Sequence, residues 1–134
     1  MTLYCATGNQ GKLREFELAA QAAGLDVKTV PNLKSIPAPD ETGVTFEENA
    51  ILKALYYSAH APDAVFADDS GLEVDALGGR PGVRSARFAK EDATSAENIA
   101  ALLTALENVE DDQRTARFRC VISRTTNCAA GASR

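Results

Sequence analysis

The 134-residue sequence has no tryptophan, one methionine and one histidine, and only 6% of its residues are aromatic. No apolar run approaches the ~20 residues that a membrane-spanning helix needs, so no membrane segment is expected. The N-terminus lacks a basic segment followed by an apolar one, and no signal peptide is expected. Three widely spaced cysteines fit neither a disulfide framework nor a zinc motif, which indicates reduced thiols in a cytoplasmic protein. The single histidine, His60, has no visible partner, so we interpret it as a helix-end cap and not as a catalytic base.

Positive charge is also in deficit, because 14 lysines and arginines stand against 19 aspartates and glutamates, a net charge of −5. A deficit of this size argues against general binding to a nucleic-acid backbone. Hydrophobic residues make up 45% of the chain, too many for a disordered protein. We therefore expect one globular domain with a modest core.

Short apolar strands alternate with amphipathic helices along the chain, which predicts an α/β fold with a mixed central sheet flanked by helices. The expected strands are residues 3–6, 25–30, 64–67 and 114–123, with 72–77 as a possible further extended segment. The expected helices are residues 12–23, residues 46–60 and one that follows the capping box Thr94–Glu97. Residues 124–134 have no periodicity, so we expect a domain over 1–123 and a divergent tail over 124–134.

The first candidate site is the segment TGNQGK, residues 7–12, between an expected strand and an expected helix. Its glycines let backbone amides converge, the helix start adds a positive dipole end, and Lys12 adds a full charge, all of which favour a phosphate group. It is not a Walker A loop, because only two residues separate its glycines and Leu13 follows the lysine, so a P-loop NTPase is disfavoured. A plain strand-to-helix turn with a surface lysine is the alternative.

The second candidate is Asp68-Asp69-Ser70-Gly71, which follows the apolar strand 64–67. Active sites of open α/β sheets gather at the carboxyl ends of strands. Adjacent carboxylates on an extended chain point to opposite sides, so one can face a metal while the other bonds a neighbouring loop. Carboxylate oxygens suit Mg²⁺, which keeps several waters beside substrate phosphates. The alternative is an ordinary acidic turn.

The third candidate combines Glu41, in a proline-rich loop, with the segment that begins the next helix. Glu41 could reach a metal held by Asp69. Asn49 and Lys53 are one helical turn apart and could share a face. Glu48 is interpreted as the partner of Thr45 in a capping box, while Lys53 could be either a ligand or a solvated side chain. A further segment with Arg80, Arg84 and Arg87 could bind phosphate, although exposed arginines of this kind are common on solvated surfaces.

Several of these segments together resemble the inosine/xanthosine triphosphate pyrophosphatases, also called dITP/XTP pyrophosphatases. The resemblance rests on TGNQGK, ETGVTFEENAILKA and ADDSGLEVDALGGRPGVRSARFA, and it continues through residues 98–106 and RTARFRC. It covers residues 2 to about 122 in the family's order. The resemblance implies a two-lobed α/β fold, a homodimer, a need for Mg²⁺ and a cytoplasmic role. It also implies hydrolysis of non-standard purine nucleoside triphosphates (ITP, dITP, XTP) to the monophosphate and pyrophosphate, which cleans the nucleotide pool.

The resemblance also implies roles for individual residues. Asp69 matches the general base and a metal-binding carboxylate, and Glu41 falls where a second metal-binding carboxylate is expected. The implied substrate-binding residues are Thr7, Gly8, Asn9, Gln10, Gly11, Lys12, Lys53 and Ser70.

The sequence departs from the family after the strand that contains Cys120. Members of the family continue into a second half of the sheet, whose base-recognising segments have no counterpart here. We therefore expect the chain to keep the phosphate-and-metal half of the site and to be C-terminally truncated. The alternative function is an inactive nucleotide- or metal-binding fragment or interaction module.

Overall fold

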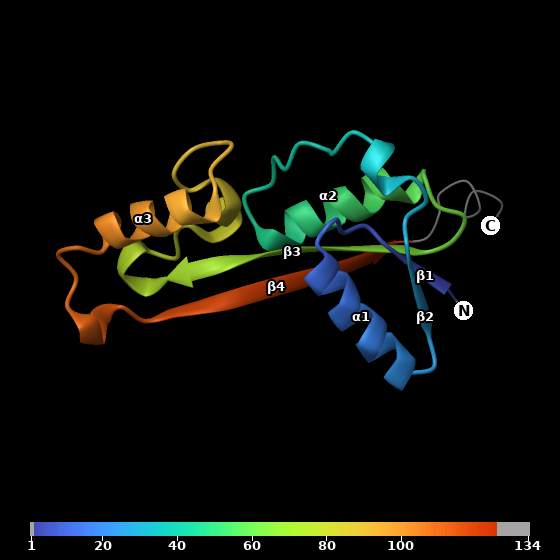
Figure 1. The fold of residues 1–134 in the computed structure, drawn as a ribbon, viewed down its shortest axis with the longest axis horizontal. Coiled ribbons are helices and arrows are strands. Elements are labelled where there is room, and N and C mark those ends of the chain that lie inside the picture. Colours follow the sequence, from blue (N-terminus) through green and yellow to red (C-terminus); the bar gives the residue numbers. More distant parts are fainter. Residues whose placement is uncertain (1, 126–134) are drawn as a thin grey trace. The chain divides into compact units, whose positions relative to one another are not determined.

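The computed structural model describes residues 2–125, and Figure 1 shows their arrangement. Four strands form one sheet in the order β2-β1-β3-β4. The strands are β1 Thr2–Cys5, β2 Asp26–Thr29, β3 Val65–Val74 and β4 Ala116–Thr125, and the helices are α1 Gln10–Ala22, α2 Phe46–Ser58 and α3 Ser95–Ala105. Short 3-10 turns cover Leu33–Ser35, Asp75–Leu77, Gly82–Arg87 and Asp111–Gln113. The predicted α/β class with a mixed sheet is confirmed.

Strand β1 pairs in parallel with both β2 and β3, so these three strands point the same way. Cys5 ends β1 and lies opposite Phe66 of β3, which then continues for eight more residues. Asp68 therefore lies just beyond the end of β1, where the loop that begins at Thr7 leaves the sheet. The register of two strands thus brings two of the candidate segments together.

The chain divides into two compact units. The first contains residues 2–68 and 121–125 of the described part, and the second contains residues 69–120. The core of the first unit is a cluster of Val30, Tyr57, Ala61 and Val65, with partly buried aromatic and aliphatic side chains packed around it. Burial of such side chains stabilises a fold by roughly 1.5–3 kcal/mol each.

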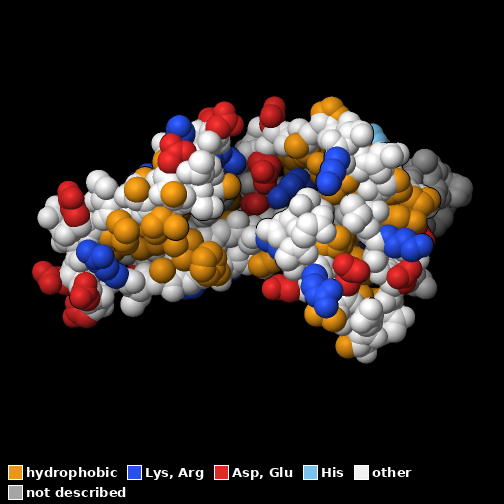
Figure 2. All heavy atoms as spheres, viewed as in Figure 1, with side chains coloured by type: hydrophobic (Ala, Val, Ile, Leu, Met, Phe, Trp, Pro, Cys, Tyr) orange, Lys and Arg blue, Asp and Glu red, His pale blue; other side chains and the backbone are white. Residues whose placement is uncertain are grey.

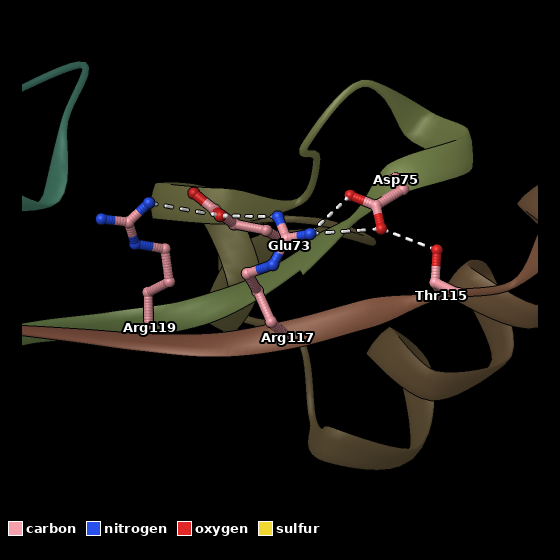
Figure 3. Close-up of polar contacts among 5 residues, drawn as sticks. All are labelled: Glu73, Asp75, Thr115, Arg117 and Arg119. Carbon is pink, nitrogen blue, oxygen red and sulfur yellow. Dashed lines mark hydrogen bonds and ion pairs between the residues drawn. The ribbon is translucent and has the colours of Figure 1, made fainter.

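Strand β4 lies beside β3 and runs in the opposite direction (Figure 1). An ionic network joins the two strands, and Figure 3 shows the Arg117 guanidinium between two carboxylates of β3 and the turn that follows it. It lies 3.1 Å from Asp75 Oδ1 and 3.6 Å from Glu73 Oε1. The hydroxyl of Thr115 donates to Asp75 Oδ2 at 2.7 Å. That bond, followed by the charge of Arg117, lowers the pKa of Asp75.

Strand β3 differs from the expectation, because the acidic segment does not follow the strand but lies inside it. The sequence predicts a strand over 64–67 and a possible extended segment over 72–77, whereas one strand runs from Val65 to Val74. Strand β3 lies between β1 and β4, and pairing with these strands outweighs the turn preference of Asp-Asp-Ser-Gly.

Two helix starts follow the predicted capping pattern to different degrees. At α3 the capping box is complete, since Thr94 Oγ1 accepts from the amide of Glu97 and Glu97 Oε1 accepts from the amide of Thr94. At α2, Thr45 Oγ1 accepts from the amide of Glu48, but Glu48 Oε2 accepts from the amide of Val44 instead. The interpretation of Glu48 as a complete capping-box partner is therefore wrong, because its side chain secures the preceding loop.

The three arginines of the glycine-proline segment have local partners in the second unit. Arg84 Nη2 lies 3.2 Å from Glu91 Oε1, and Arg87 Nε lies 4.0 Å from the other oxygen of the same carboxylate. The Arg80 guanidinium stacks 5.6 Å above the ring of Phe88. Each of the three arginines thus has a contact with a neighbouring side chain of the second unit.

No helix in the described part of the chain is long and apolar enough to cross a membrane.

Candidate phosphate and metal site

The loop that leaves β1 is held by its own side chains. Thr7 is buried, and its Oγ1 accepts from the amide of Asn9 at 3.2 Å. Asn9 is the N-cap of α1, and its Oδ1 accepts from the amide of Lys12 at 3.1 Å. A side-chain oxygen that accepts from the first turn is the preferred way to begin a helix. The hydrogen bonds that begin α1 are thus made within the loop itself.

Three amides of this loop are left for a ligand. Within residues 2–125, the N–H groups of Gly8, Gln10 and Gly11 make no hydrogen bond. They lie at the start of a 13-residue helix whose first turn has no acidic side chain. Unpaired amides and the positive end of the dipole together favour an anion. Neither glycine of the loop has a positive φ, so their contribution is a surface without side chains and not a special turn.

Lys12 turns back toward the sheet and meets Asp68. Its Nζ lies 2.7 Å from Asp68 Oδ2. The carboxylate side chain is only 4% exposed, whereas the lysine side chain is 35% exposed. The buried carboxylate therefore holds the lysine side chain, part of which remains exposed to solvent. Asp68 is therefore the carboxylate of the Asp-Asp pair that bonds a neighbouring loop.

The buried end of β1 reports on the electrostatics around Asp68. Burial, followed by the nearby negative charge of Asp68, raises the pKa of the Cys5 thiol from 9.0 to about 12. Both causes disfavour a thiolate. Cys5 is thus a protonated core residue at neutral pH, and the predicted reduced thiol of Cys128 lies outside the described residues.

Glu41 and Lys53 form a second ion pair, in which Lys53 Nζ lies 3.0 Å from Glu41 Oε1. Glu41 is on the loop before α2 and Lys53 is in the middle of that helix. Their side chains are 34% and 19% exposed. The predicted metal carboxylate and the predicted phosphate lysine are therefore adjacent within the first unit.

Asp69 and Ser70 lie on β3 at the start of the second unit. Asp69 is buried and Ser70 is half-buried. In residues 2–125 there is no group of three or more His, Cys, Asp and Glu side chains that could hold a metal. Mg²⁺ does not need such a group, since it commonly uses one or two carboxylates and completes its shell with waters and phosphate oxygens. The carboxylates Glu41 and Asp69 are hard oxygen donors of the type that fits Mg²⁺.

A cavity of about 420 Å³ opens beside the loop in the first unit. It lies where β1 and β2 end, and it is lined by Thr7, Gly8, Gln10 and residues 29–35. Ligands of open α/β sheets bind at this edge. Three residues of the loop, Thr7, Gly8 and Gln10, therefore border an open space.

Sequence reasoning missed two contributors to this site. It left open whether Asp68 or Asp69 bonds the loop, because sequence spacing gives no side-chain direction relative to a distant lysine. It also gave Gly43 no role, although an added Cβ there would lie 2.6 Å from Asn49 Oδ1 and 2.7 Å from Glu48 Cβ. The sequence shows only a glycine six residues before an asparagine, and this spacing alone does not predict a contact between the two residues.

The sequence model of the Ham1 family matches residues 3–132. The chain belongs to the Ham1 family. It is 52% identical over 118 residues to the dITP/XTP pyrophosphatase of Geobacillus kaustophilus, which is 88% of this chain and 58% of that protein. It is 48% identical over 118 residues to the dITP/XTP pyrophosphatase of Bacillus subtilis, which is 88% of this chain and 60% of that protein. The family resemblance in the sequence is thereby confirmed.

Solved Ham1 proteins have the same fold. The Staphylococcus aureus Ham1 protein matches with a TM-score of 0.78 and 42% identity over 93% of this chain and 63% of the other. The Coxiella burnetii HAM1 protein matches with a TM-score of 0.83 and 38% identity over 95% of this chain and 64% of the other. The chain thus spans about three fifths of the length of these Ham1 relatives.

Proposed function

We propose that this Ham1 chain hydrolyses non-standard purine nucleoside triphosphates, such as ITP, dITP and XTP, to the monophosphate and pyrophosphate. The observation that carries the proposal is its 48–52% identity to dITP/XTP pyrophosphatases over 88% of the chain. The phosphate loop and two lysine–carboxylate pairs in the first unit support it.

In the proposed reaction the loop amides of Gly8, Gln10 and Gly11 and the ammonium groups of Lys12 and Lys53 bind the phosphate oxygens. Each lysine already has a carboxylate partner, so its head group is oriented before the substrate arrives. Preorganised charge of this kind lowers the barrier because it needs little rearrangement during the reaction.

The oxygen of a water forms a bond to the α phosphorus while the bond from that phosphorus to the α–β bridging oxygen breaks. Asp69 accepts a proton of that water, and the products are the nucleoside monophosphate and pyrophosphate. Ser70 contacts the substrate beside it. Glu41 and Asp69 would hold Mg²⁺, which supplies charge neutralisation on the phosphate oxygens when bound. These roles of Asp69, Ser70, Glu41 and Mg²⁺ belong to the proposal, as do a homodimer and a cytoplasmic location.

The decisive experiment is pyrophosphate release from ITP, with and without Mg²⁺. We expect Mg²⁺-dependent release that falls at least about 10²-fold in Asp69→Asn, because a lost general base typically costs 10²–10⁴-fold. The exposed Asp92→Asn is the matched control, and it should release pyrophosphate as the unchanged chain does.

A folded chain that binds ITP with Mg²⁺ but releases no pyrophosphate would reject turnover. That outcome would favour the alternative, a nucleotide- or metal-binding fragment or interaction module. A chain that releases pyrophosphate equally well with Asp69→Asn would reject the assigned base.

A further inference from the structure

We propose that Asn49 is a positioning residue that clamps the loop bearing Glu41 onto helix α2 and so fixes the Glu41 carboxylate beside Lys53. The role toward a metal rests on the proposed function of Glu41. The clamp itself rests on contacts within the first unit.

Asn49 is fully buried, with none of its surface exposed. Both ends of its side-chain amide meet the same residue of the loop. Its Oδ1 accepts from the amide of Gly43 at 2.8 Å, and its Nδ2 donates to the carbonyl of Gly43 at 3.4 Å. Two hydrogen bonds from one rigid amide group fix both the position and the direction of the loop backbone. Because Asn49 is buried, water cannot replace these bonds, and their loss lowers stability.

Gly43 allows this contact because it has no side chain. A Cβ at this position would lie 2.6 Å from Asn49 Oδ1 and 2.7 Å from Glu48 Cβ. Real Cβ atoms do not approach other atoms so closely, so the loop backbone rests directly on α2 only because residue 43 is glycine. Its φ is not in the left-handed region, so close approach is the requirement.

The clamp lies on the same helix row as the lysine of the site. Asn49 and Lys53 are four residues apart on α2 and share a face. Glu41 precedes Gly43 by two residues, and its Oε1 lies 3.0 Å from Lys53 Nζ. Because the Glu41–Lys53 pair is partly exposed, it cannot by itself hold the loop rigidly. We infer that the buried clamp supplies the rigidity and the ion pair follows from it.

The exposed bond from Val44 to Glu48 provides a matched control. Glu48 Oε2 accepts from the amide of Val44 at 2.8 Å, so it secures the same loop but at the surface. A surface bond contributes little, since water can replace it. Glu48→Ala therefore tests loop attachment in general, and Asn49→Ala tests the buried clamp.

The first readout is the affinity of the full chain for Mn²⁺ alone, measured by electron paramagnetic resonance. We expect Asn49→Ala to weaken Mn²⁺ binding at least about tenfold, the usual effect of removing a residue that orients a metal ligand. Glu48→Ala should change it less than about threefold, as expected for an exposed hydrogen bond. Equal weakening by both variants, unchanged affinity in Asn49→Ala, or no Mn²⁺ binding by the unchanged chain would each overturn the inference.

Two further measurements test the clamp even if the Asn49→Ala variant does not fold. Gly43→Ala keeps Asn49 but displaces the loop, and it should weaken Mn²⁺ binding similarly. In the unchanged chain, hydrogen exchange at the Gly43 amide should be at least about tenfold slower than at Thr42, because its acceptor is buried. A Gly43 amide that exchanges as fast as Thr42 rejects the clamp.

The experiments distinguish failure of the proposed reaction from failure of the Asn49 clamp. Mn²⁺ binding that depends on Asn49, together with no pyrophosphate release, would support the clamp and reject the reaction. Pyrophosphate release with a KM for Mg²⁺ that is unaffected by Asn49→Ala would support the reaction and reject the clamp.

Discussion

At the scale of single residues, the Lys12–Asp68 pair shows how a buried carboxylate positions a more exposed lysine. Asp68 is nearly inaccessible, while Lys12 keeps about a third of its side chain in solvent. Burial leaves the Asp68 carboxylate little freedom to move, so the ion pair holds the Lys12 ammonium in one place. The lysine head group is therefore positioned before a ligand binds, which lowers the entropic cost of binding.

We predict that Asp68→Asn lowers kcat/KM for ITP about tenfold or more, because a phosphate ligand misplaced by about 1 Å can cost on the order of 10²-fold. The free energy of unfolding should fall by only ~1 kcal/mol, since the released lysine can turn to water. Steady-state kinetics and thermal melting measure the two effects.

The matched control is Asp26→Asn, which removes a carboxylate 4.0 Å from Lys28 on an exposed strand. It should leave both quantities unchanged. Wild-type kcat/KM in Asp68→Asn would show that Lys12 needs no anchor.

At the scale of elements, the caps of α2 and α3 explain why their positions could be predicted to within a residue or two. Thr45 and Thr94 each accept from an amide three residues on, a purely local interaction. Glu97 completes the box at α3, and the hydrogen bond to the Thr94 amide, followed by Lys90, lowers its pKa. The stabilising effect of ionised Glu97 is therefore present near neutral pH and is lost as the solution is acidified through that lowered pKa.

We predict that Thr94→Ala lowers the free energy of unfolding by ~1 kcal/mol, the usual effect of removing an N-cap. This should lower Tm by about 3 to 5 °C in a chain of this size. Differential scanning calorimetry is the measurement.

Thr104→Ala, on the exposed side of the same helix, is the control. It should leave Tm unchanged or raise it, because alanine favours a helix interior. Equal losses in both variants would show that the hydroxyl of Thr94 has no capping role.

Strand β3 shows where local reasoning fails at this scale. The run Asp68-Asp69-Ser70-Gly71 has turn-forming composition, yet it forms the middle of a ten-residue strand. The deciding interactions come from β1 and β4, which are distant in sequence. Local propensity is a weak prior that long-range pairing overrides.

At the scale of the whole molecule, hydrophobic side chains remain on the surface. Figure 2 shows them gathered on the second unit along α3. The large exposed hydrophobics of that unit are Phe118, at 83%, and Ile99 and Leu103, at 58% and 55%. On β4 the side chains of Phe118 and Cys120 are both exposed in the described part of the chain.

We predict that Phe118→Ser reduces self-association of the chain, because exposed apolar strand surface promotes contact between molecules. The free energy of unfolding should change by less than about 0.5 kcal/mol, since a side chain this exposed contributes little to the stability of the fold. Light scattering coupled to size-exclusion chromatography measures the association.

The control is Val44→Ser, which removes a 78% exposed hydrophobic side chain from a loop outside the sheet. It should have little effect on association. Association that is equal in the unchanged chain and in Phe118→Ser would exclude this face as its cause.

The sequence by itself determined the features that depend on near neighbours. Periodicity predicted three helices and four strands, caps such as Thr94 marked helix starts, and ordered motifs identified the family. Only the tertiary structure decided that Lys12 meets Asp68, 56 residues away, and that Asn49 clamps Gly43. Local signals follow from bond rotations and adjacent side chains, whereas these partners depend on strand register and close backbone approach, which form only when the whole sheet is assembled.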